Sequence, residues 1–190
     1  MKNSSPTLNE MEKRLALGTF GPQLWTRDLA RTIRAELNEM LENAADGSLV
    51  VIDAASVEVF DYSFANELFG KTLLSLPNEY PGKFLVVENL SPYARENLIK
   101  ALESLGIAMI ERKKKSLELI GKIHPAYSET FAIMTKAKEP ITVNFIAEKL
   151  EINITAASER LTKLVNLGLA RREKATSVSG REQFTYTTVS

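Results

Sequence analysis

The sequence contains no cysteine and a single histidine, His124. Disulfides, thiolate metal sites and cysteine nucleophiles are therefore excluded, and no second histidine is present to build a metal cluster. Glycine is sparse too, and none of the nine glycines forms the GxGxxG or Walker pattern that cradles phosphates. No spacing marks a carboxylate pair for acid–base chemistry. We therefore expect a protein that is not an enzyme and that has no cofactor and no metal.

Long apolar runs and an excess of either charge are also missing. No apolar stretch approaches the roughly 18 to 20 residues of a membrane span, and the polar N-terminus does not resemble a secretory signal. We expect a cytoplasmic protein without a membrane partner. Lys plus Arg and Asp plus Glu each number 24, so the chain as a whole lacks the basic footprint of a nucleic-acid-binding protein. Residues 123–190 carry nine cations against seven anions, so any DNA affinity must depend on a few placed cations.

Helical and strand-like segments alternate over most of the chain. Hydrophobic spacing predicts helices at 26–44, 63–76 and 92–105, and strands at 14–20, 49–52, 84–87, 107–111 and 116–120. Thr26 and Ser91 are expected N-caps, either Asp61 or Ser63 is expected to cap the second helix, and Gly106 is the expected stop signal. This alternation predicts an α/β domain over residues 13–122, with a sheet covered by helices. Residues 1–12 are polar and are expected to be a flexible N-terminus.

A different pattern follows from residue 123 to residue 190. Three helices are expected at 125–137, 143–150 and 155–167, and two strands at 169–173 and 183–188 around a polar tip. Thr142 and Thr155 are predicted N-caps, and Asn153 is placed in a tight turn between the last two helices. Three helices followed by a hairpin predict a small α+β domain, separate from the first.

Four stretches of this second region carry a family resemblance: FIAEKL at 145–150, INIT at 152–155, ASERLTKL at 157–164 and LGLARR at 167–172. They resemble the winged helix-turn-helix domains of bacterial and archaeal regulators. The resemblance implies that the helix at 155–167 enters the major groove of duplex DNA and that the hairpin acts as a wing. It therefore implies a transcriptional regulator that binds double-stranded DNA.

The outer face of that recognition helix would contact base edges through Thr155, Ala156, Glu159, Arg160 and Lys163. Arginine and lysine can reach guanine acceptors, glutamate can accept from cytosine, and threonine can contact phosphate or a thymine methyl. The wing would supply cations for phosphates or the minor groove: Arg171, Arg172, Lys174 and Arg181. An alternative interpretation is that these residues form a solvated surface and that the fold mediates protein contacts.

The first region carries a second resemblance. LVVIDAASVEVFDYSFANELFG at 49–70, with TRDLA at 26–30 upstream, resembles STAS-like domains, relatives of the anti-anti-sigma-factor fold. In those relatives a serine directly after an aspartate at this helix start is phosphorylated by a partner kinase, where the helix N-terminus favours a phosphate. Here Tyr62 follows Asp61 at that position, and Ser63 comes next. Asp61, Tyr62 and Ser63 are thus candidate regulatory residues. The interpretation we favour has Ser63 as an N-cap and Phe64 in the core.

Two cationic groups remain. Arg27, Arg31 and Arg34 share one helix face by their spacing, which suits a nucleotide, a phosphate or an acidic partner, although a solvated face has the same pattern. The segment from Arg112 to Lys115 is predicted to be a four-cation turn, either beside the DNA backbone or with no role beyond closing a hairpin.

The leading hypothesis is a DNA-binding regulator whose STAS-like domain is a partner-, ligand- or dimerisation module. The alternative is a non-DNA-binding adaptor that engages a histidine-kinase-type ATPase in a partner-switching system. The weakest hypothesis is that the α/β domain binds a small molecule or is catalytic. Winged-helix regulators are often dimers, so a homodimer is also considered, although no heptad seam supports it.

Overall fold

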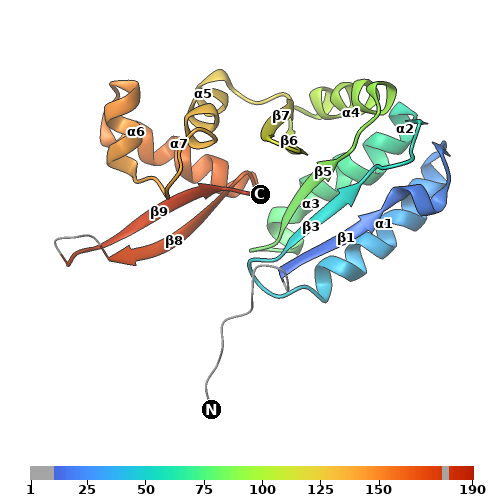
Figure 1. The fold of residues 1–190 in the computed structure, drawn as a ribbon, viewed down its shortest axis with the longest axis horizontal. Helices are drawn as coiled ribbons and strands as arrows, with labels where there is room; N and C mark the ends of the chain where they lie inside the picture. The colour runs from blue at the N-terminus through green and yellow to red at the C-terminus, as the bar shows by residue number, and fades with distance from the viewer. Residues whose placement is uncertain (1–10, 177–179) are drawn as a thin grey trace, which may run out of the picture. The chain divides into compact units, whose positions relative to one another are not determined.

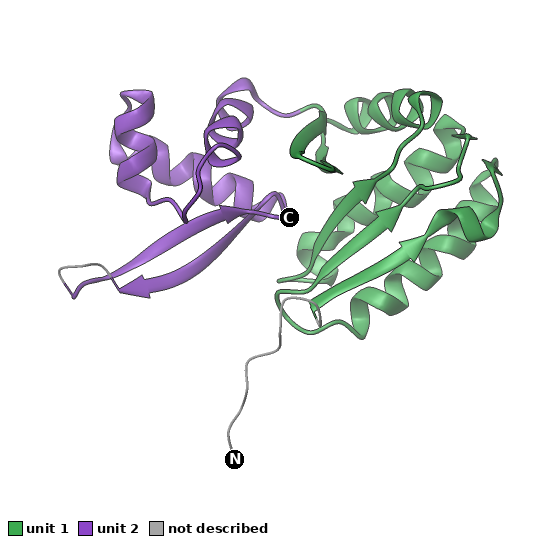
Figure 2. Ribbon diagram, in the orientation of Figure 1, with its two compact units in different colours: residues 1–122, 190 green, residues 123–189 purple. Residues whose placement is uncertain are grey.

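The computed structural model describes residues 11–176 and 180–190. The flexibility expected for residues 1–12 therefore falls almost wholly outside the described residues. The chain divides into two compact units, residues 1–122 together with Ser190 (unit 1) and residues 123–189 (unit 2; Figure 2). In the described ranges, no helix combines the length and the apolar character that crossing a membrane requires.

Unit 1 is built on a five-stranded mixed sheet with the strand order β1-β3-β5-β6-β7. Its strands are β1 (Glu12–Ala16), β3 (Leu49–Asp53), β5 (Phe84–Glu88), β6 (Ala108–Lys113) and β7 (Ser116–Gly121). The first four strands run parallel, and β7 pairs antiparallel with β6. The predicted α/β class is confirmed.

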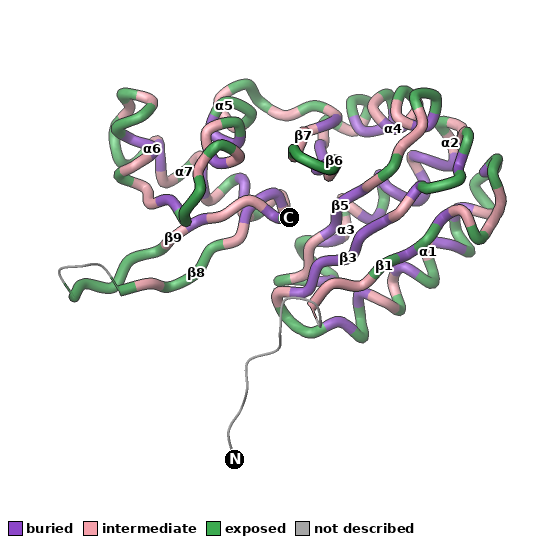
Figure 3. The backbone as a smooth tube through the Cα atoms, viewed as in Figure 1, coloured by how far each residue is buried: buried purple, intermediate pink, exposed green. Residues whose placement is uncertain are grey.

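The helices of unit 1 lie on one face of this sheet (Figure 1). They are α1 (Arg27–Glu42), α2 (Tyr62–Ala65), the π-helical turn η3 (Asn66–Gly70), α3 (Lys71–Glu79) and α4 (Pro92–Leu105). Parallel strands in sequential order, joined by right-handed crossovers, place every crossover helix on the same side. The main core contains Ile52 and Val87 on that side. Val51 and Val86 are also buried and alternate with them along β3 and β5, so they lie on the opposite face. Figure 3 shows the buried stretches of both strands.

The N-caps predicted for α1 and α4 and the stop signal predicted for α4 were confirmed. The Thr26 hydroxyl accepts from the amide of Leu29, 3.4 Å away, and opens α1. The Ser91 hydroxyl accepts from Ala94 at 3.2 Å and opens α4. Gly106 ends α4 in the left-handed region, with a φ of 66° that a side chain would disfavour.

Two predicted elements of unit 1 have different bounds in the structure. The strand predicted at 14–20 ends at Ala16, and a 3-10 turn, η2 (Leu17–Phe20), follows with Leu17 fully buried. The helix predicted from about Ser63, with Asp61 or Ser63 as its cap, starts at Tyr62, because the Asp61 carboxylate accepts from the amide of Phe64 at 2.7 Å. It also continues to Glu79 as η3 and α3. A short pairing of β2 (Gln23–Leu24) with β4 (Val59–Phe60) had no sequence prediction.

Unit 2 contains α5 (Pro125–Met134), α6 (Val143–Leu150) and α7 (Ile154–Asn166), followed by the antiparallel hairpin of β8 (Ala170–Thr176) and β9 (Glu182–Thr188). The predicted order of elements is confirmed, although α5 ends three residues early. Tyr186 of the hairpin pairs with Ile141, which ties β9 to the segment before α6. The buried residues of the unit include Phe131, Ile146 and Leu161, so the three helices and the hairpin share one core.

Candidate nucleic-acid interface

The connection between α6 and α7 is short and closed by backbone and cap hydrogen bonds. Helix α6 ends at Glu151, whose φ of 53° lies in the left-handed region, and the amide of Ile152 donates to the carbonyl of Ala147 at 3.0 Å. Asn153 then opens α7, with its side-chain oxygen accepting from Ala156 at 2.8 Å. Thr155 was predicted to be this cap. It lies instead inside the first turn of α7, which leaves its side chain available for other contacts.

The outer face of α7 carries a polar stripe of three exposed residues, Thr155, Glu159 and Lys163. They recur at intervals of four, so they lie one above another along the helix. Within the described part of the chain, neither Glu159 nor Lys163 has an ion-pair partner. Ala156, also predicted to contact DNA, is half-buried. The stripe therefore offers one hydroxyl, one carboxylate and one ammonium group, which together can accept from and donate to base edges.

Arg160 does not belong to this stripe. Its guanidinium Nη1 lies 3.0 Å from the Glu129 carboxylate and 3.5 Å from the carbonyl oxygen of Ala126, both on α5. The side chain is 20% exposed. The sequence prediction placed Arg160 on the base-reading face, whereas the structure uses it to join α7 to α5.

The hairpin carries a second set of cations. Arg172 lies opposite Tyr186 and Lys174 lies opposite Phe184 in the strand register, so these four residues occupy one face. The guanidinium carbon of Arg172 sits 4.7 Å from the centre of the half-exposed Phe184 ring, a cation–π geometry. Arg181 is exposed just before β9. The tip between the strands, residues 177–179, lies outside the described residues.

Arg171 points to the other face of the hairpin, because side chains alternate along a strand. It is half-buried, and this burial lowers the pKa of its guanidinium. Of the four predicted wing cations, Arg172, Lys174 and Arg181 are therefore the ones exposed for a phosphate contact. In protein–DNA complexes, phosphate contacts position the protein on the duplex, and base contacts specify the sequence.

The candidate regulatory residues of unit 1 lie at the start of α2. Asp61 is committed to the cap, and the Tyr62 hydroxyl shares a 2.8 Å hydrogen bond with the Ser104 hydroxyl of α4. Ser63 is partly exposed and does not cap the helix, although the predicted burial of Phe64 is confirmed.

The arginine face of α1 is divided between two environments. Arg27 is exposed and, among the described residues, has no ion-pair partner. Arg31 and Arg34 lie 3.7 Å and 3.0 Å from one carboxylate oxygen of Glu67, and Lys71 lies 2.6 Å from the other. The Glu67 side chain is 1% exposed. Two of the three predicted cations are therefore fixed around a buried anion.

Sequence reasoning missed Glu67, although a glutamate inside the apolar run from Phe64 to Phe69 was a usable signal. Burial by itself would raise the pKa of this carboxyl group. Lys71 first, then Arg34 and Arg31, outweigh that effect and hold the pKa below its ordinary value. The carboxylate is thus charged at neutral pH. Its π-helical turn is a rare geometry that recurs at functional sites.

A second ionic network crosses the helix-free face of the sheet. Arg14 of β1 lies 2.9 Å from Asp53 and 2.7 Å from Glu88, at the ends of β3 and β5. Arg112 of β6 bonds Glu88 and, at 2.9 Å, Glu12. The network therefore bridges four neighbouring strands.

The predicted four-cation turn from Arg112 to Lys115 was wrong, because two of its residues are paired within the sheet. Arg112 and Lys113 belong to β6, and Lys113 lies 2.6 Å from Glu118 of β7. Lys114 and Lys115 form the turn itself. Arg112 is thus a structural residue and not a cation held out for the DNA backbone.

The described residues contain no group of three or more His, Cys, Asp or Glu side chains that could hold a metal ion. No protein-family model matches this chain, and no curated protein matches its sequence. The site must therefore be interpreted from its own geometry.

Proposed function

We propose that this protein is a DNA-binding transcriptional regulator and not an enzyme. In this proposal residues 123–190 form a winged helix-turn-helix, with α7 as the recognition helix and the β8–β9 hairpin as the wing. Residues 13–122 form a STAS-like module that binds a partner or ligand or mediates dimerisation.

The observation that supports the proposal most directly is the exposed stripe of Thr155, Glu159 and Lys163. A helix held by a three-residue turn is rigid enough to present such side chains in fixed positions, and the major groove of B-DNA, roughly 12 Å wide, admits a helix. Arg172 and Lys174 follow on the hairpin and suit phosphate contacts. Base-edge groups and phosphate-binding groups thus come from consecutive elements of one unit.

The small number of available cations limits the electrostatic part of binding. Each phosphate neutralised lowers the slope of log K against log salt by about 0.9 in B-DNA. With Arg160 and Arg171 drawn into the structure, we expect a shallow salt dependence, and sequence selectivity should depend strongly on Glu159 and Lys163.

The test is selection of duplexes from a random library at low salt, followed by fluorescence anisotropy with the enriched sequence. Lys163→Ala should weaken binding and relax base preference, and Arg172→Ala should weaken binding to all duplexes while reducing the salt slope by about 1. Lys138→Ala, a matched loss of an exposed cation between α5 and α6, should change affinity little. Failure to enrich any duplex, or equal affinity of all three variants, would contradict the proposal.

A second function is favoured by two exposed aromatic residues near the start of α2. Trp25 is 45% exposed and Tyr62 is 40% exposed. Trp25 follows β2 directly, and the amide of Asp61 donates to the carbonyl of Leu24 at 3.3 Å, so both residues flank the same strand pair. Such a surface suits a protein partner, which supports the adaptor that engages a histidine-kinase-type ATPase.

Co-purification with purified ATPases of that class tests the adaptor. Trp25→Ala and Tyr62→Ala should abolish capture, whereas Tyr93→Ala, which removes an even more exposed aromatic ring at the start of α4, should not. Capture that is insensitive to Trp25 and Tyr62 would exclude this surface.

A further inference from the structure

The charges of α1 are arranged against the dipole of the helix. Arg27, Arg31 and Arg34 lie in its first half, and Glu36, Glu39 and Glu42 lie in its second half; Asp28 in the first turn is the exception. A helix macrodipole is positive at the N-terminus and favours the opposite order, by roughly 0.3 to 1 kcal/mol per exposed charge. Asp28 and Glu67 pair with Arg31 and Arg34, so, among the described residues, the charges nearest the two ends of α1 that have no ion-pair partner are Arg27 and Glu42. A surface that is basic at one end and acidic at the other is complementary to itself when turned through a two-fold axis.

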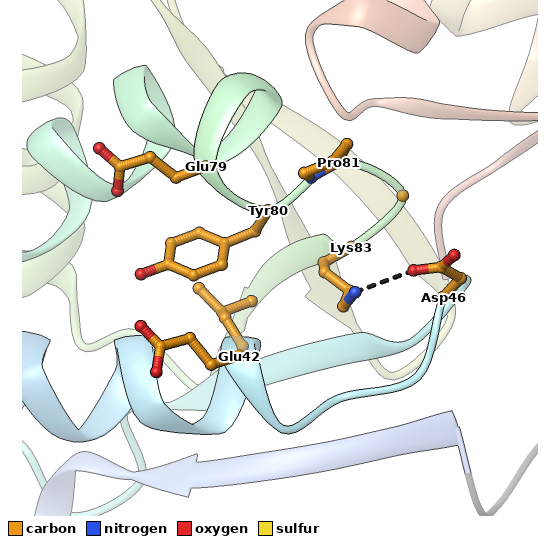
Figure 4. Close-up of a pocket in the computed structure, with 8 residues that line it drawn as sticks. Glu42, Asp46, Glu79, Tyr80, Pro81 and Lys83 are labelled. Carbon is orange, nitrogen blue, oxygen red and sulfur yellow. Dashed lines mark hydrogen bonds and ion pairs between the residues drawn. The ribbon is translucent and has the colours of Figure 1, made fainter.

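The C-terminal, acidic end of α1 borders a pocket, which we call the acidic hollow. This pocket of 780 Å³ lies where α1 and α3 end, and its lining includes Glu42, Asp46, Glu79, Tyr80 and Lys83. Figure 4 shows the Tyr80 hydroxyl directed to the side where the carboxylates of Glu42 and Glu79 lie. Tyr80 is 8% exposed, and no described residue bonds its hydroxyl. Lys83 is neutralised by Asp46 at 2.9 Å, so the hollow keeps a negative charge.

The basic end offers one cation that has no anion of its own. Arg27 is exposed and unpaired within the described part of the chain, while Arg31 lies 2.8 Å from Asp28 and 3.7 Å from Glu67, and Arg34 lies 3.0 Å from Glu67. From Arg27 to Glu42 the helix extends about 22 Å at 1.5 Å per residue. The free guanidinium and the acidic hollow thus lie at opposite ends of one helix.

We propose that a second copy of this chain docks antiparallel on α1, with Arg27 of each copy seated in the acidic hollow of the other. A planar guanidinium suits a site with two carboxylates, a hydroxyl group and an aromatic ring. The two-fold axis makes the contact twice, because in an isologous interface residue i meets j and j meets i.

This inference rests on the dimerisation role within the proposed function and gives it a surface. Dimer formation is measured without DNA, so the dimerisation proposal and the DNA-binding proposal can fail independently. The full chain is examined by sedimentation velocity over a range of concentration and salt. The wild type should dimerise, with an affinity that falls as salt rises, because the contact is ionic.

Charge-reversal variants test directly whether Arg27 meets the acidic hollow across the interface. Arg27→Glu alone, and Glu42→Arg combined with Glu79→Arg, should each raise the dimer dissociation constant by about tenfold or more, because a like charge is met at both contacts. An equimolar mixture of the two variants should restore dimers, since one contact then keeps its native charges and the other has them exchanged. Restoration shows that each variant is folded and that the charges meet across the interface.

Lys114→Glu and Glu36→Arg reverse exposed charges of the same kinds outside the contact and should leave the dimer unchanged. A wild type that stays monomeric at every concentration overturns the proposal, and the hollow would then suit a basic side chain of a different protein. Variants that dimerise like the wild type, or a mixture that stays monomeric, overturn it equally.

Discussion

In unit 1 the guanidinium groups of Arg14, Arg34 and Arg112 lie against carboxylates, whereas on the outer surface of unit 2 Lys163 and Arg172 have no carboxylate partner among the described residues. Both units carry similar numbers of charges for their size, and the chain as a whole is neutral. The difference lies in how each unit uses its charges. Unit 1 joins strands and helices with them, and unit 2 presents several of them to solvent. Net charge alone therefore conceals where a charged ligand can bind.

The comparison predicts that two matched Arg→Met substitutions change the free energy of unfolding by very different amounts. Arg112→Met removes the group that holds Glu12 and Glu88 together, and it should lower the free energy of unfolding by about 2 to 3 kcal/mol. This is less than a fully buried pair would give, because these side chains keep some solvent contact. Arg172→Met removes an exposed cation and should change stability by no more than about 0.5 kcal/mol.

Urea unfolding followed by Trp25 fluorescence reports on unit 1, because the chain's only tryptophan lies there. Far-UV circular dichroism reports on both units. If Arg172→Met proved as destabilising as Arg112→Met, the distinction between structural and surface cations would be lost.

A smaller effect is expected at the buried anion of unit 1. Glu67→Gln removes the charge that faces Arg31, Arg34 and Lys71, and should lower the free energy of unfolding by about 1 to 2 kcal/mol at neutral pH, because the three cations then lose the buried anion that they share. Glu96→Gln is the matched control, since it removes an exposed carboxylate paired with Lys100 at 2.6 Å on α4. Such exposed pairs contribute little.

The effect of Glu67 should also depend on pH in a defined direction. Its pKa is lowered in the folded protein from an ordinary value of 4.5. The carboxylate therefore binds fewer protons when folded, and its stabilisation is complete above that value and lost as pH falls through the lowered pKa. The stability difference between wild type and Glu67→Gln should shrink in acid. A difference that stays constant to low pH would show that the side chain stabilises by packing and not by charge.

Hydrophobic periodicity was sufficient for most elements of the fold. The strands around Val50 and Val86 and the helix capped by Ser91 lie where the pattern placed them, because burial on one side of a sheet requires that spacing. The boundary at residues 17–20 was missed, because a 3-10 turn with a buried leucine continues the same alternation of apolar residues that a strand shows.

The candidate site was less predictable from sequence than the fold. A helical wheel places Arg160 near the outer face of α7, but its long side chain reaches Glu129, 31 residues earlier in the chain. The ion pairs of Glu67 and Arg112 likewise join residues that are distant in sequence or lie on different elements. Periodicity records which face is buried, and it does not record which charges meet. Exposure of Thr155, Glu159 and Lys163 followed from spacing alone, since no long-range partner intervened.

The smallest expected change in stability distinguishes Asn153, the N-cap of α7, from the nearby Thr155. Asn153→Ala removes the side-chain acceptor for the amide of Ala156 and should cost about 1 kcal/mol of stability, the usual loss for an N-cap. Thr155→Ala removes no cap and should change stability by less than about 0.5 kcal/mol. Under the proposed function it should still weaken binding to the selected duplex, because its hydroxyl faces outward. Hydrogen exchange at the first turn of α7 reports the cap, and anisotropy reports the duplex. If Thr155→Ala loosened that turn as much as Asn153→Ala, Thr155 would have a structural role, and its place in the base-reading stripe would have to be given up.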